Sequence, residues 1–164
     1  MKYFTPELLH GYGSSDPAVY RTAAQEWEDR CERYKAYIET AKAHMPAGLL
    51  DLDRYLLHDA VVRAMGRKDD AFVITVQLDA APHTLLTFTY DLVAEPVIKR
   101  GVLPPEECTP DSHIEWQYDE IEEIEDRGAV WEHSILLSNG WELCIRFRDV
   151  EVTELQPVFA AEAG

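Results

Sequence analysis

The spacing of apolar residues changes once along this 164-residue chain, and that change constrains the fold more than any other feature. Up to about residue 53 the apolar residues recur every three or four positions, which is typical of helices. Beyond it they alternate with polar residues, as in strands. One long helix followed by strands predicts an α+β fold with a mostly antiparallel sheet of roughly five to seven strands. A doubly wound parallel sheet is disfavoured because each parallel pair needs its own crossover.

The long helix is predicted to begin at Pro17. The side-chain oxygens of Ser14, Ser15 and Asp16 are suited to capping free backbone N–H groups at a helix start. Proline has no backbone N–H, but at the first position of a helix that N–H would have no partner within the helix, so Pro17 is well tolerated there. An apolar stripe follows over about seven turns, until Pro46 and Gly48 end the helix; it consists of Tyr20, Ala24, Trp27, Cys31, Tyr34, Ile38, Ala41 and Met45. We expect this amphipathic helix to pack on the sheet. The alternative is a self-associating structural module that forms a homodimer through the helix.

Strands are predicted at 61–65, 72–78 and 86–92, and a hairpin turns at Ser138, Asn139 and Gly140. A two-residue loop would place the apolar residues of its two strands on opposite faces. A three-residue loop with a left-handed Gly140 instead pairs Ile135 with Leu143 and Trp131 with Phe147, which we predict.

The chain is expected to form a single domain over 1–164. Its helical part covers about 1–57, its strand-rich part about 58–156, and 157–164 form a frayed tail. No apolar run is long enough to cross a bilayer, and the first residues lack the apolar centre of a secretory signal. The three cysteines show no C-x-x-C spacing. These features predict a cytoplasmic protein.

The negative charge is concentrated in the last third of the chain. The formal net charge is −16, of which residues 1–100 carry −3 and residues 101–164 carry −13. Nucleic acids and anionic membranes are excluded as partners because both are polyanions. Such a charge attracts a basic protein.

An acidic strip from 115 to 126 is the densest part of this charge. We interpret it as a docking surface for a basic protein partner, so that the chain is an interaction protein and not an enzyme. The predicted partner-binding residues are Glu115, Trp116, Tyr118, Asp119, Glu120, Glu122 and Glu123. The alternative is a solvated edge strand whose charges prevent aggregation.

No motif for a catalytic nucleophile, a phosphate loop or a metal centre is present, so we assign no catalytic residue, cofactor or metal ligand. His58 and Asp59 form a candidate ligand site. A second hypothesis is based on these two residues: the chain is a metal-dependent or small-ligand-binding protein, or a hydrolase. Adjacent residues of an extended chain point to opposite sides, which disfavours a direct contact between the two side chains.

Four segments together resemble a family of small bacterial proteins of unknown function: Met1-Lys2-Tyr3-Phe4-Thr5, the helical stretch 27–37, Leu56-Leu57-His58-Asp59-Ala60, and Trp116-x-Tyr118-Asp119-Glu120. The resemblance implies a bacterial cytosolic protein with a helical N-terminal part and an antiparallel sheet. It implies no activity, cofactor or catalytic residue. In size, acidity and its strand-rich second half, the chain is also similar to immunity proteins of bacterial polymorphic toxin systems.

Overall fold

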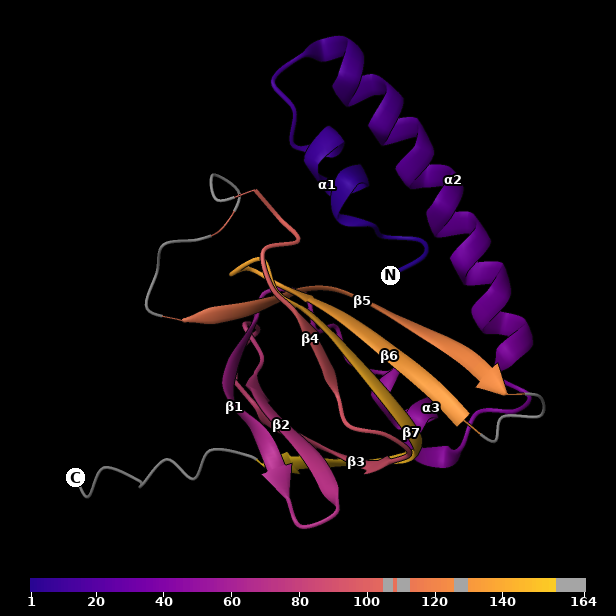
Figure 1. The fold of residues 1–164 in the computed structure, drawn as a ribbon, viewed down its shortest axis with the longest axis vertical. Helices are drawn as coiled ribbons and strands as arrows, with labels where there is room; N and C mark the ends of the chain where they lie inside the picture. The colour runs from indigo at the N-terminus through magenta and orange to yellow at the C-terminus, as the bar shows by residue number, and fades with distance from the viewer. Residues whose placement is uncertain (105–107, 109–112, 126–129, 156–164) are drawn as a thin grey trace.

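Six antiparallel strands close into a barrel, and three helices lie at its side and end (Figure 1). The computed structural model describes residues 1–104, 108, 113–125 and 130–155. The ring order is β1-β2-β3-β7-β6-β5, and β4 pairs with the first part of β7 outside the ring. The strand bounds are β1 Ala60–Lys68, β2 Ala71–Gln77, β3 Leu85–Leu92, β4 Val97–Lys99, β5 Ile114–Glu125, β6 Val130–Leu137 and β7 Glu142–Leu155. The predicted α+β class with an antiparallel sheet is confirmed.

The barrel interior is filled by the alternate residues of its strands. Phe72, Ile74 and Val76 on β2 lie directly opposite Tyr90, Phe88 and Leu86 on β3, and all six are buried, as the alternation predicts. The largest fully buried side chains are Trp116, Trp131, Tyr90, Phe88 and Phe147. Aromatic side chains bury large apolar areas, so this interior supplies most of the hydrophobic stabilisation.

The barrel is weakest between β1 and β5, where only Ala60–Val62 and Ile114–Trp116 are paired. Further along β5 the free edge faces helix α2 (Pro17–Ala41). The hydroxyl of Tyr34 accepts the N–H of Ile121 at 2.8 Å, and that of Tyr37 accepts the N–H of Glu123 at 2.6 Å. Burial raises the pKa of Tyr34, which keeps this hydroxyl neutral. The helix thereby satisfies backbone donors that an edge strand would otherwise expose.

Helix α2 begins where the sequence predicts. An oxygen of Asp16 accepts the N–H of Ala18 at 2.8 Å, and Pro17 is the first helical residue. The helix ends at Ala41, earlier than predicted, and Met45 lies beyond it but is still buried.

Only part of the predicted stripe on α2 packs on the sheet. Ile38 and Ala41 join the barrel core, whereas Tyr20 is 42% exposed. The N-terminal part of α2 lies instead beside α1 (Pro6–Tyr12) and extends beyond the barrel (Figure 1). The expectation of one helix lying along the sheet therefore holds only for its C-terminal part.

The β6–β7 hairpin has the predicted three-residue turn. Gly140 has φ +75°, and the N–H of Leu137 donates to the carbonyl of Trp141 at 2.9 Å. Ile135 pairs with Leu143, and Trp131 pairs with Phe147. Both the register and the left-handed glycine are confirmed.

A short helix, α3 (Ala47–Leu52), connects α2 to the barrel and packs on β7. None of the helices in the described ranges has the length and apolarity needed to cross a membrane. The predicted tail 157–164 lies outside the described residues, as does Asp126 of the acidic strip.

Candidate functional site

The predicted acidic strip does not form a free anionic surface. Trp116 is fully buried inside the barrel, and Glu120 is 4% exposed. Three of its other carboxylates lie next to basic side chains: Glu115 beside His113 at 3.0 Å, Glu122 beside Lys2 at 2.9 Å, and Glu123 beside His44 at 3.5 Å. Residues of one strand alternate between two faces, so its acids cannot all point toward one partner.

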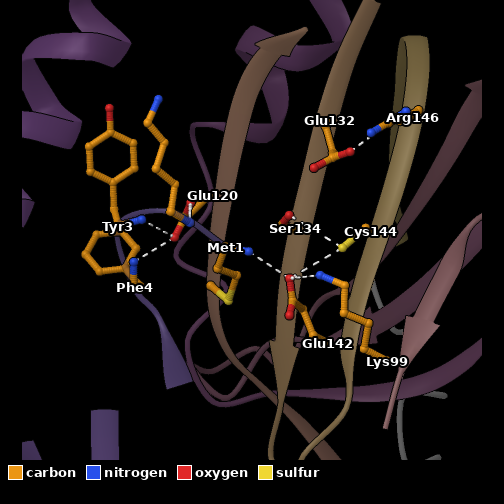
Figure 2. A network of polar contacts seen from close by, with 11 residues as sticks. Met1, Tyr3, Phe4, Lys99, Glu120, Glu132, Ser134, Glu142, Cys144 and Arg146 are labelled. Carbon is orange, nitrogen blue, oxygen red and sulfur yellow. Dashed lines mark hydrogen bonds and ion pairs between the residues drawn. The ribbon is translucent and has the colours of Figure 1, made fainter. Parts of the chain in front are cut away.

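The N-terminal segment, residues 1–4, covers the outer side of β5 (Figure 2). The Glu120 carboxylate accepts three consecutive backbone N–H groups, from Lys2 at 2.7 Å, Tyr3 at 2.8 Å and Phe4 at 2.6 Å. Hydrogen bonds to a charged acceptor are about twice as strong as neutral ones. Glu120 therefore binds the N-terminal segment to the barrel. Its role is structural, in place of the predicted role in docking.

A second buried carboxylate, Glu142 on β7, holds the end of this segment (Figure 2). It contacts the Met1 ammonium at 2.7 Å and Lys99 Nζ at 3.1 Å. Burial opposes its ionisation, but hydrogen bonds and charge from both cations outweigh burial and hold the pKa of Glu142 below its ordinary value. The neighbouring Cys144 thiol donates to this carboxylate at 3.4 Å, and burial raises the pKa of Cys144. A raised pKa makes this thiol a poor nucleophile.

Asp119 belongs to a chain of polar groups that enters the barrel. One oxygen accepts the indole N–H of Trp116 at 2.8 Å, and the other lies 3.2 Å from Nε2 of His133. Nδ1 of His133 lies 3.0 Å from the Tyr90 hydroxyl. Because His133 and Tyr90 are fully buried, this chain of hydrogen bonds satisfies polar groups in the core.

Sequence reasoning missed the buried role of His133. Its signal was present, since His133 falls between Trp131 and Ile135 in the inward-facing series of β6. A histidine at such a position needs hydrogen-bond partners inside the core. Asp119, taken for a docking residue, supplies one of them.

An acidic hollow of about 620 Å³ lies on the other side of the barrel, between α3, β2, β3 and β7. Carboxylates from distant parts of the sequence line it, together with Gly48, Ala71, Thr89, Val150 and Val152; the acids are Asp51, Asp70, Asp91, Asp149 and Glu151. Asp51 has Arg54 at 3.1 Å. Among the described residues, no ion pair joins the other four to a basic side chain. No local pattern in the sequence indicates this site, because its acids are up to a hundred positions apart.

Gly48 determines how closely α3 approaches the hollow. A Cβ atom at this position would overlap the backbone carbonyl of Val150 and approach Asp149. Only glycine allows this contact, which places Asp51 of α3 at the rim beside the acids of β7.

His58 and Asp59 do form a direct contact, contrary to the expectation from an extended chain. Asp59 has φ +66°, a left-handed conformation that aspartate tolerates better than most residues. This turn brings its Oδ2 to 3.0 Å from Nδ1 of His58. Both side chains line a second cavity, of about 280 Å³, together with Tyr12 and Tyr118.

In the part of the chain that the structure describes, no group of three or more His, Cys, Asp or Glu side chains is placed to hold a metal ion. Comparisons of the chain with family models, with curated proteins and with solved structures found no match. The two resemblances noted in the sequence therefore stay predictions, and the interpretation of function rests on the sites described above.

Proposed function

We propose that this protein is a non-enzymatic interaction protein that binds a basic protein partner, and that the acidic hollow receives cationic side chains of that partner. One observation carries the proposal. The hollow of about 620 Å³ is lined by five carboxylates, from α3, the β1–β2 turn, β3 and β7, and the described residues of its lining include no lysine, arginine or histidine.

Physical chemistry supports a cationic occupant of the hollow. Like charges held around one concave surface repel each other, and a bound cation relieves that repulsion. Two of the five acids, Asp149 and Glu151, come from the region after residue 100 that carries most of the excess charge. The acids of the predicted strip contribute less, because the first part of the chain already neutralises several of them.

The class of partner follows from charge and from the resemblance to immunity proteins. A protein that neutralises a toxin has to recognise a folded surface, and an acidic inhibitor suits a toxin with a basic surface. A bacterial toxin domain with exposed lysines or arginines is therefore the partner class that we propose. Catalysis by this chain is not part of the proposal.

A lysine-rich peptide provides the first test, titrated into the full chain by calorimetry at rising salt. We expect saturable binding that weakens with salt and is lost in the hollow variant D91N/D149N/E151Q. The matched control is E28Q/E39Q/D79N, which removes three exposed acids outside the hollow and changes the net charge equally. Equal weakening in both variants would mean that net charge alone attracts the peptide, and the proposed site would be wrong.

A further inference from the structure

The cavity beside His58 is a separate site, independent of the acidic hollow. It has a volume of about 280 Å³ and lies where the end of α1, the turn before β1 and the start of β5 meet. The side chains that matter for its chemistry are Tyr12, His58, Asp59, Gln117 and Tyr118. Among the described residues that line it, there is no lysine or arginine.

Three residues with aromatic rings, Tyr12, His58 and Tyr118, line this cavity, and Trp27 contacts both tyrosines. The ring of His58 lies 5.0 Å from that of Tyr118 at an angle of 76°, and Tyr118 lies 4.9 Å from Trp27 at 70°. Trp27 in turn lies 5.5 Å from Tyr12. The edge-to-face contacts of Tyr118 with His58 and Trp27, and the tilted contact of Trp27 with Tyr12, hold the rings in fixed orientations. The faces of such rings carry partial negative charge and attract cations.

Asp59 brings a carboxylate to the same cavity; its Oδ2 lies 3.0 Å from Nδ1 of His58, and the side chain stays 58% exposed, so it can also face a ligand. Its backbone N–H donates to the carbonyl of Trp116 at 2.9 Å, and the N–H of Ala60 donates to Leu57, which fixes the turn. The left-handed conformation at Asp59 is a sparsely populated state, and residues held in such states cluster at binding sites.

The phenol of Tyr118 does not compete with this charge. Burial raises the pKa of Tyr118, with further contributions from Tyr12 and Asp59, so the ring stays neutral at physiological pH. The cavity therefore offers neutral tyrosine rings and the Asp59 carboxylate with His58 beside it.

We propose that this cavity binds a small organic cation with an alkylated ammonium head, such as a quaternary amine. Alkylated ammonium groups are weakly hydrated and gain most from aromatic faces, and the Asp59 carboxylate balances their charge. An anion is excluded by the same carboxylate. A neutral ligand gains nothing from it, which separates this site from an ordinary apolar pocket.

Choline and its neutral isostere 3,3-dimethylbutanol test the charge requirement directly. We expect choline to bind the full chain with one saturable site, observed as shifts of the Tyr and Trp resonances or fluorescence, and the neutral isostere to bind about fivefold more weakly or worse. Equal binding of the two, or no saturable choline binding, would overturn the proposal. Tighter binding of ethanolamine than of choline would also overturn it, because hydrogen bonding would then determine recognition.

Two pairs of variants test the residues. D59N removes the charge while asparagine still tolerates the left-handed backbone, and we expect it to weaken choline binding about fivefold or more. E151Q, which removes one charge from the acidic hollow, is its control and should leave choline binding unchanged. Y118F keeps the aromatic face and should bind like the unmodified chain, whereas Y118L should not. Unchanged binding in folded D59N or in folded Y118L would contradict the proposed site.

Discussion

The two acidic regions of this protein differ in what their carboxylates face. On the outer side of β5 and β7, Glu120 and Glu142 face backbone N–H groups, the Met1 ammonium and Lys99. In the acidic hollow, Asp70, Asp91 and Glu151 line one cavity together with two further acids. The first region therefore stabilises the fold, and the second is the one for which we propose a partner.

This difference shows why net charge along a sequence does not locate an interaction surface. The strip around residue 120 has the highest density of acids, yet the first four residues of the chain cover part of it. A carboxylate that accepts hydrogen bonds from its own chain is already desolvated and paired, and it offers little to a partner. Four predictions test whether the acids of the first region stabilise the fold and those of the hollow do not.

The largest expected effect is that of E120A in the first region. Removing this carboxylate leaves the N–H groups of Lys2, Tyr3 and Phe4 without their acceptor, and we expect a loss of about 4 kcal/mol in the free energy of unfolding. Urea denaturation measures it. The control is E122Q, which removes only the exposed contact with Lys2 and should cost about 0.5 kcal/mol or less. Similar small losses in both variants would mean that the N-terminal segment contributes little to stability.

Replacing Gly48 tests whether the hollow depends on the close contact between α3 and β7. Alanine in a helix normally stabilises by about 1 kcal/mol relative to glycine. Here the added Cβ overlaps the carbonyl of Val150, so α3 has to move, and we expect G48A to destabilise by about 3 kcal/mol. G66A is the control, because a Cβ at Gly66 meets no atom within 4 Å. If G48A is as stable as the unmodified chain, α3 can pack on the barrel without this close contact.

The pH dependence of stability tests Glu142 in the first region. Its pKa is lowered in the folded protein, so it stabilises the fold above its unfolded pKa, and this contribution disappears as the pH falls through the folded pKa. We expect E142Q to cost about 2 kcal/mol at pH 7 and the difference from the unmodified chain to shrink steadily on acidification. Denaturation curves at several pH values measure this difference. A constant or growing difference at low pH would contradict the assigned direction.

Local patterns in the sequence predicted local structure well. The Asp16 cap, the alternation in β2 and β3, and the hairpin with left-handed Gly140 all depend on residues close together in the chain. Pairing of side chains across long sequence distances could not be predicted in this way. Glu120 meets Lys2 over 118 positions, and nothing near either residue indicates the other.

The candidate sites were predictable only in part for the same reason. His58 and Asp59 were identified as a pair of residue types, but their contact depends on one left-handed backbone angle that an extended-strand argument does not include. The acidic hollow collects residues from α3, β2, β3 and β7, so it becomes visible only when the barrel closes. The prediction that Trp116 binds a partner was wrong. An aromatic residue among acids suggests an exposed binding residue, but the alternation of the strand points Trp116 into the core.

The smallest expected effect concerns stability in the second region, and its sign is opposite to that of the others. Because the carboxylates of the hollow repel each other, D91N/D149N/E151Q should stabilise the free protein by about 0.5 kcal/mol at low ionic strength. Added salt should stabilise the unmodified chain by screening that repulsion, and the variant should respond less. The control E28Q/E39Q/D79N changes the net charge equally with acids that lie apart in the sequence and outside the hollow, so it separates the effect of crowding acids around one hollow from that of total charge. Thermal unfolding at several salt concentrations measures all three proteins. Destabilisation of the hollow variant would contradict this prediction. It would mean that the carboxylates of the hollow stabilise the fold, as Glu120 and Glu142 do.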